Sequence, residues 1–107
     1  MRETVQANVA LPLPAIRAFC QKWDIVEFAL FGSVLREDFG PESDIDVLVR
    51  FRSGVRHGLR DWLAMGDELE AILGRRVDLI ERQTLETSRN YIRRKAILDS
   101  LEVIYAE

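Results

Sequence analysis

The sequence predicts an α+β domain in which a small mixed β-sheet has helices packed on one face. Apolar residues recur at helical spacing in two stretches, residues 13–23 and 59–73. In two other stretches, residues 26–31 and 45–51, apolar residues occur at every second position, as they do on one face of a strand. Because helical and strand patterns follow one another without a repeat or a linker, one layered domain over residues 1–107 is expected.

The composition fits such a domain and excludes several other classes. Of 107 residues, 48% are hydrophobic and 31% are charged, which allows both a core and a solvated surface. The lone Cys20 excludes a disulfide scaffold, and no apolar run approaches the roughly 18 residues of a membrane span. No secretory signal is visible, so we expect a cytoplasmic protein. A net charge of −3 argues against general nucleic-acid binding.

The first elements are a helix and a strand. Pro12 and Pro14 favour a helix start, and the apolar stripe of that helix continues to Trp23. The strand at residues 26–31 then ends at Gly32-Ser33. A short helical turn and a Gly-Pro turn are expected before the next strand.

The clearest strand runs from Ile45 to Phe51, and its two faces differ in chemistry. The apolar face is formed by Ile45, Val47, Val49 and Phe51. The other face is formed by Asp44, Asp46, Leu48 and Arg50. This strand therefore carries two carboxylates on one side.

The second half of the chain predicts two helices and two strands. The helix at residues 59–73 stops at Gly74, and the strand at residues 76–80 follows. Asp78 lies on the face of that strand opposite its apolar residues. A helix from Thr84 or Thr87 to about Leu98 and a short strand at residues 101–105 complete the chain.

Three carboxylates converge if the apolar faces of these strands share one helical layer. Asp44, Asp46 and Asp78 would then lie together, which is costly unless a cation neutralises them. Oxygen ligands suit Mg²⁺, and two Mg²⁺ ions suit an in-line phosphoryl displacement. The alternative is that Asp44 is a turn residue and the other two are exposed strand charges.

Gly32-Ser33 adds a possible phosphate site at the end of the preceding strand. Glycine allows close approach of the backbone to a ligand, and the Ser33 hydroxyl with free N–H groups suits a phosphate. An ordinary serine helix cap is the alternative. Neither the P-loop nor the dinucleotide-binding glycine motif is present.

The combined pattern resembles the minimal nucleotidyltransferase (MNT) family of the DNA polymerase beta-like superfamily. The resemblance spans about residues 13–105 and is carried by Phe31-Gly32-Ser33-Val34-Leu35-Arg36, Ser43-Asp44-Ile45-Asp46-Val47-Leu48-Val49 and Val77-Asp78-Leu79. It implies a polymerase beta-like palm fold and transfer of a nucleoside monophosphate, AMP from ATP, to a hydroxyl.

The resemblance also assigns site residues. The nucleotide-binding positions are Gly32, Ser33, Arg36 and Ser43. The catalytic and metal-binding positions are Asp44, Asp46 and Asp78, with two Mg²⁺ ions. Since all three carboxylates are present, the resemblance implies a catalytically competent member.

The resemblance implies a partner as well. Small MNT proteins are commonly encoded beside HEPN-domain toxins and act as antitoxins by transferring AMP to a toxin tyrosine. One alternative is a non-catalytic module that neutralises its partner by contact. Another is a small-molecule enzyme resembling aminoglycoside nucleotidyltransferases, for which the chain is short unless it forms a homo-dimer. A hetero-complex with the toxin is compatible with the AMP-transferring antitoxin and with the non-catalytic module.

Two basic clusters have no assigned role. The loop cluster comprises Arg50, Arg52, Arg56, His57 and Arg60, and it either contacts a triphosphate or an acidic partner or is a solvated loop. The helix cluster comprises Arg89, Arg93, Arg94 and Lys95, and it either docks a partner or RNA or is a solvated face. His57 has no companion ligand nearby in sequence, so a zinc site is not expected.

Overall fold

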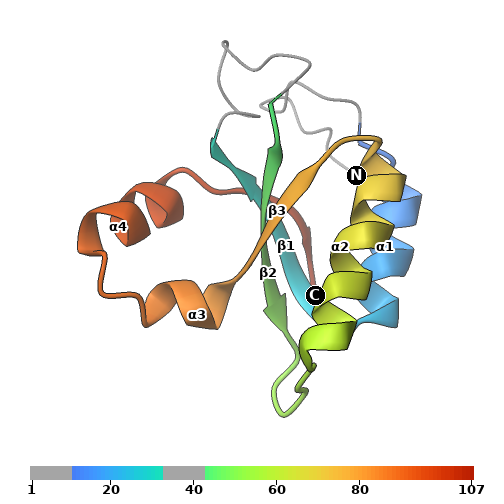
Figure 1. Ribbon diagram of the computed structural model, residues 1–107, viewed down its shortest axis with the longest axis horizontal. Helices are drawn as coiled ribbons and strands as arrows, with labels where there is room; N and C mark the ends of the chain where they lie inside the picture. Colours follow the sequence, from blue (N-terminus) through green and yellow to red (C-terminus); the bar gives the residue numbers. More distant parts are fainter. Residues whose placement is uncertain (1–10, 33–42) are drawn as a thin grey trace.

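The structure, a computed structural model, describes residues 11–32 and 43–107, and four strands within them form one mixed sheet (Figure 1). The strand order is β3 (Val77–Glu81), β2 (Ile45–Phe51), β1 (Ile25–Phe31) and β4 (Glu102–Ala106). β1 is antiparallel to both β2 and β4, whereas β2 and β3 are parallel. The predicted α+β class with a mixed sheet is confirmed.

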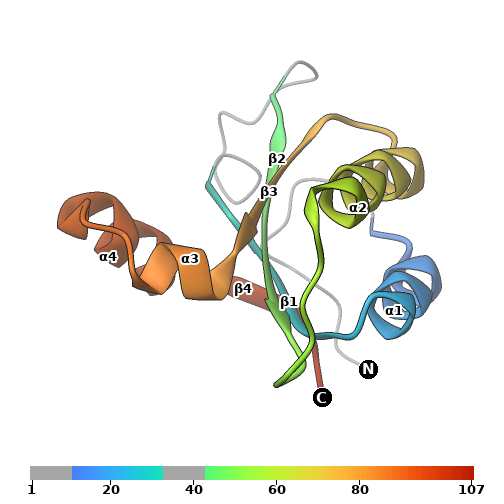
Figure 2. The same ribbon diagram turned by 60° about the horizontal axis from the view of Figure 1, so that its bottom comes forward.

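Two long helices, α1 (Leu13–Lys22) and α2 (Leu59–Leu73), cover one face of the sheet (Figure 2). Their apolar stripes meet the strand residues that alternation assigned to that face. The core between them contains Ile16, Phe19, Cys20, Phe28, Leu30, Ile45, Val47, Val49, Met65 and Leu69. α2 ends where predicted, because Gly74 adopts the left-handed conformation with φ 69°.

The opposite face carries two short helices, α3 (Arg82–Glu86) and α4 (Tyr91–Asp99) (Figure 2). Leu85 and Ile97 from these helices pack on Ala29, Phe31 and Leu48 in a second, smaller cluster. The prediction that helices pack on one face of the sheet is therefore correct for α1 and α2, but it missed α3 and α4 on the other face. The apolar residues at the centre of this second face are shielded from water by the two helices.

The single helix predicted from Thr84 or Thr87 to Leu98 is wrong, because this stretch forms α3 and α4 separately. The Asn90 side chain accepts a hydrogen bond from the Arg93 main-chain N–H at 3.1 Å and so starts α4. An asparagine in this position favours a helix start over continuation of the preceding helix.

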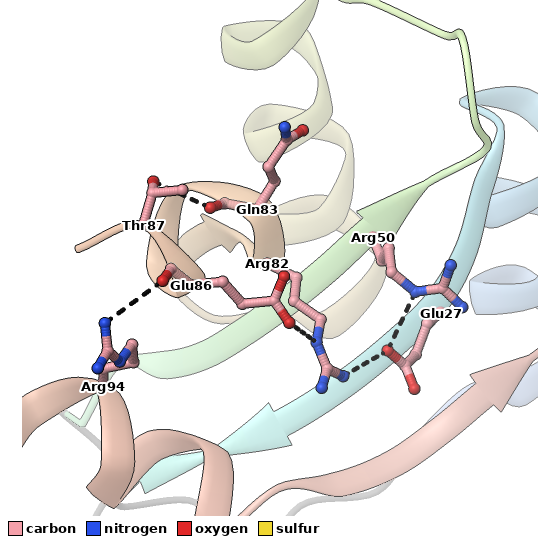
Figure 3. A network of polar contacts seen from close by, with 7 residues as sticks. All are labelled: Glu27, Arg50, Arg82, Gln83, Glu86, Thr87 and Arg94. Carbon is pink, nitrogen blue, oxygen red and sulfur yellow. Dashed lines mark hydrogen bonds and ion pairs between the residues drawn. The ribbon is translucent and has the colours of Figure 1, made fainter. Parts of the chain in front are cut away.

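A polar network fastens α3 to the sheet (Figure 3). Arg82 donates to Glu27 of β1 at 2.8 Å and to Glu86 at 3.1 Å, while Arg50 of β2 lies 3.5 Å from Glu27. Hydrogen bonding to Glu86 and then to Glu27 raises the pKa of the Arg82 guanidinium above its ordinary value. Arg94 of α4 also donates to the Glu86 carbonyl at 3.4 Å, so both short helices belong to this network.

His57 joins the end of α1 to the start of α2. Its Nε2 lies 2.9 Å from the Trp23 carbonyl oxygen and its Nδ1 lies 3.1 Å from an Asp61 carboxylate oxygen. The ring also packs edge-on against Phe51, with centroids 4.8 Å apart. These contacts give the histidine a structural role.

Cys20 lies fully buried in the core, as its place in the apolar stripe of α1 predicts. Burial, with a smaller contribution from the Glu107 charge, raises the pKa of its thiol from 9.0 to about 12. The folded protein therefore retains this proton at pH values where the unfolded chain loses it.

The expected result is a free energy of unfolding that falls as the pH rises from 9 towards 12, by up to about 1.4 kcal/mol per pH unit from this group. Urea denaturation of the native protein and of Cys20→Ala at several pH values measures it. The slope attributable to Cys20 is absent in the variant. Equal slopes in the two proteins would contradict the argument.

No helix within residues 11–32 and 43–107 combines the length and the apolar character that crossing a membrane requires.

Candidate active site

Asp46 and Asp78 are neighbours on adjacent parallel strands. Asp46 of β2 is in register with Asp78 of β3, and neighbouring strands lie about 4.8 Å apart. Val47 and Leu79, the next pair in register, point into the core under α1 and α2. Because side chains alternate along strands, both carboxylates emerge on the face opposite these two helices. The predicted juxtaposition of these two residues is confirmed.

Asp44 is placed differently from the other two carboxylates. It precedes β2, it is half-exposed, and its Oδ1 lies 3.4 Å from Nε of Arg76. Among the described residues, no three acidic, histidine or cysteine side chains lie together as a metal-binding group. The structure thus pairs Asp46 with Asp78 and leaves Asp44 beside an arginine at the same edge of the sheet.

Gly32, at the end of β1, lies against Asp46. Its φ is 76°, a conformation that side-chain-bearing residues rarely adopt. A Cβ at this position would collide with Oδ2 of Asp46. The absence of a side chain at Gly32 therefore lets the Asp46 carboxylate approach the main chain closely. Ser33 and Arg36 lie outside the described residues.

Ser43 is held by a residue that the sequence did not single out. Nη2 of Arg75 donates to the Ser43 carbonyl oxygen at 2.9 Å, and the Ile45 N–H donates to the Arg76 carbonyl oxygen at 2.9 Å. These contacts join the segment before β2 to the segment before β3. Two adjacent arginines directly before the strand that carries Asp78 are the only sequence signal for this arrangement.

Loss of the Arg75 contact is expected to loosen the segment that carries Ser43 and Asp44. Arg75→Gln is expected to lower the free energy of unfolding by about 1–2 kcal/mol, because a half-buried, charge-assisted hydrogen bond disappears. The matched control is Arg76→Gln, whose exposed ion pair contributes about 0–1 kcal/mol. Chemical denaturation of both variants measures the difference, and equal losses would contradict a special role for Arg75.

The donor set fits a hard divalent cation. Asp46 and Asp78, in register on adjacent strands, offer carboxylate oxygens, which are the ligands that a hard divalent cation prefers. Mg²⁺ binds through one or two carboxylates and completes its shell with water or substrate phosphates. Asp44, on the same side of the strand, can add a third carboxylate to this set.

The basic loop cluster lies at the other end of β2 from Asp46. Two of its members are engaged inside the protein, since Arg50 pairs with Glu27 and Arg52 donates to Glu107 at 2.8 Å. Glu107 in turn keeps the pKa of Arg52 above its ordinary value. The structure therefore engages Arg50 and Arg52 in contacts away from the carboxylates.

Comparison with protein families identifies the family of this domain. The family model described as nucleotidyltransferase domain matches residues 15–101, which include all three aspartates. Over 64 residues the chain is 38% identical to MJ1379 of Methanocaldococcus jannaschii, covering 60% of this chain. Over 67 residues it is 33% identical to protein adenylyltransferase MntA of Thermococcus cleftensis, covering 63% of this chain. These matches span 64% and 66% of the relatives' own lengths.

Two solved structures share the fold. A chain of a toxin–antitoxin with AMP-PNP superposes with a TM-score of 0.68 at 17% identity, covering 91% of this chain and 75% of that one. A chain from the complex of a tri-AMPylated Shewanella oneidensis HEPN toxin with an MNT antitoxin gives a TM-score of 0.59 at 16% identity, covering 89% and 70%. With the family match over most of its length, the chain belongs to the nucleotidyltransferase domain family.

Proposed function

We propose that this protein transfers AMP from ATP to the hydroxyl of a protein tyrosine and releases pyrophosphate. The observation that carries the proposal is the pairing of Asp46 with Asp78 in register on adjacent strands. Gly32 lies against the Asp46 carboxylate on the side away from Asp78. A relative that is 33% identical is named a protein adenylyltransferase, which supports AMP as the transferred group.

Asp44 and Asp46 would hold two Mg²⁺ ions, with Asp78 contributing to one of them, and these ions would neutralise charge on the triphosphate. Gly32 and Ser33 seat the β and γ phosphates, while Arg36 and Ser43 support the loop around them. Asp78 orients the acceptor hydroxyl and accepts its proton. Most of the rate enhancement then comes from positioning and from neutralising charge.

The bonds and charges of this transfer balance without a further reactant. The acceptor oxygen forms a bond to the α-phosphorus of ATP. The bond from that phosphorus to the oxygen bridging to the β-phosphate breaks, and pyrophosphate leaves with its electron pair. The proton of the hydroxyl passes to the Asp78 carboxylate and from there to solvent. The products are an adenylylated acceptor and pyrophosphate.

The acceptor that we propose is a tyrosine of a HEPN-domain toxin, which makes this cytoplasmic protein an antitoxin. The fold similarity to an MNT antitoxin in complex with a tri-AMPylated HEPN toxin supports this choice.

Intact-mass spectrometry of the protein encoded by the neighbouring gene tests the proposal. After incubation with this protein, ATP and Mg²⁺, we expect a gain of one or more AMP units, mapped to tyrosine by peptide fragmentation. Each of the other three nucleoside triphosphates serves as a comparison for the base. A partner that is restrained in cells yet carries no nucleotide with any of the four would instead support neutralisation by contact.

A further inference from the structure

We propose that the acceptor segment of the partner binds as an extended strand along the open edge of β3, next to Asp78. This inference rests on the proposed function and adds to it the place and the chemistry of acceptor binding. It starts from a groove of about 600 Å³ beside β3. The groove is lined by Asp78 and Ile80 of β3, Leu59 and Trp62 of α2, Leu85 of α3 and Arg93 of α4, among others.

Within residues 11–32 and 43–107, no further strand pairs with the edge of the sheet that borders the groove. β3 is the last strand of the sheet, with β2 on its other side. The Ile45 N–H donates to the Arg76 carbonyl oxygen. Because main-chain hydrogen-bonding groups alternate in direction along a strand, the N–H and C=O groups of residues 76, 78 and 80 point towards β2. The Val77 N–H confirms this direction, because it points away from β2 and donates to the Glu70 side chain at 3.0 Å.

The same alternation turns the main-chain N–H and C=O of Leu79 and the N–H of Glu81 outwards, along the groove. An extended polypeptide satisfies such groups by adding a strand, and this is a recurring mode of peptide recognition. A nucleic acid has no equivalent row of main-chain groups. The edge therefore favours a protein segment as the occupant.

The walls of the groove specify the side chains of that segment. Leu59, which lines the groove, is 73% exposed. Outside the lining, Leu63 one turn further along α2 is 59% exposed and Ile92, the chain neighbour of Arg93, is 78% exposed. Apolar residues with this exposure gather at interaction surfaces. The side chain of Arg93, which lines the groove, forms no ion pair within residues 11–32 and 43–107. Apolar and cationic walls fit a segment in which apolar and acidic residues flank the tyrosine.

The main-chain part of the proposal is tested by Glu81→Pro against Glu81→Ala. Both variants remove the side chain, and only proline removes the outward N–H. The φ of −87° at Glu81 and its place on an edge strand permit proline. With the purified product of the neighbouring gene as the ligand, we expect the proline variant to bind about three- to tenfold more weakly than the alanine variant.

The wall residues are tested by Leu59→Glu and Arg93→Glu, with Arg17→Glu on the far helix α1 as the matched control. Binding to the partner is measured by isothermal titration without ATP, and KM values for ATP and for the partner are measured separately. We expect weaker partner binding by at least tenfold in both groove variants, an unchanged KM for ATP, and no change in Arg17→Glu. Circular dichroism confirms that each variant is folded.

The outcomes separate this proposal from the proposed function. Unchanged partner binding in folded groove variants, while the native protein still transfers AMP, would overturn the groove and leave the transferase intact. Partner binding that depends on the groove without any AMP transfer would support the groove and overturn the transferase. Single-stranded RNA that binds the native protein and is lost in Arg93→Glu, with partner binding unaffected, would overturn the groove as a protein site.

Discussion

Asp46→Asn is expected to lower the rate of AMP transfer by about a thousandfold or more, while the protein remains fully folded. The substitution keeps the shape of the side chain and removes the charge that lies between Gly32 and Asp78. Loss of one preorganised charge at a phosphoryl-transfer site costs roughly 10²–10³-fold, and loss of a metal ligand adds to that cost. Single-turnover kinetics with labelled ATP measures the effect.

Stability distinguishes this effect from misfolding. Because Asp46→Asn keeps the shape of the side chain and leaves the apolar core unchanged, the free energy of unfolding should change by less than about 1 kcal/mol. The matched control is Asp67→Asn on the exposed side of α2, which should leave both activity and stability unchanged. Full transfer activity in folded Asp46→Asn would mean that the carboxylate pair is not the catalytic centre.

Gly32→Ala is expected to impair both stability and activity. The positive φ of Gly32 costs a side-chain-bearing residue about 1–2 kcal/mol, and the new Cβ would also collide with the Asp46 carboxylate. Together these effects should lower the free energy of unfolding by about 2–3 kcal/mol. The carboxylate must move to relieve the collision, so AMP transfer should fall by at least tenfold in the fraction that remains folded.

Gly54→Ala separates the two causes. Gly54 has a similar φ of 86°, and a Cβ there meets no atom of the described residues within 4 Å. Only backbone strain remains, so this variant should lose about 1–2 kcal/mol and keep its activity. Chemical denaturation and a transfer assay on both variants make the comparison. Equal behaviour of the two glycine variants would show that the contact with Asp46 has no functional consequence.

The sequence predicted the part of the site that depends on alternation within strands. The faces of β2 and β3 follow from period-two patterning, and this patterning placed Asp46 and Asp78 on the same side before any register was known. The bounds of α2 could be predicted equally well, because an apolar stripe and Gly74 define them locally in the sequence.

The parts that sequence reasoning missed depend on contacts between distant segments. Arg75 reaches Ser43 across 32 positions, and the ion pair of Arg76 with Asp44 spans a similar separation. Nothing local distinguishes such arginines from solvated ones. The division into α3 and α4 was missed because it depends on the cap at Asn90, a single side chain in an otherwise helical stretch.

The structural role of Gly32 could also be predicted only in part from the sequence. Its position at a strand end indicated close approach of some group, but the sequence pattern of β1 does not show that the Asp46 carboxylate fills that space. The antiparallel pairing of Phe31 with Asp46 brings the two together, and this pairing becomes evident only in the folded sheet.

The central claim, transfer of AMP through the Asp46–Asp78 pair, is tested most directly with ATP labelled at either the α- or the γ-phosphate. The protein is incubated with Mg²⁺ and the product of the neighbouring gene, and label on the partner is counted after denaturing electrophoresis. The account predicts that the α-label stays on the partner, that the γ-label leaves as pyrophosphate, and that Asp46→Asn transfers neither. Transfer of the γ-label, or an equal α-label signal from Asp46→Asn, would contradict it.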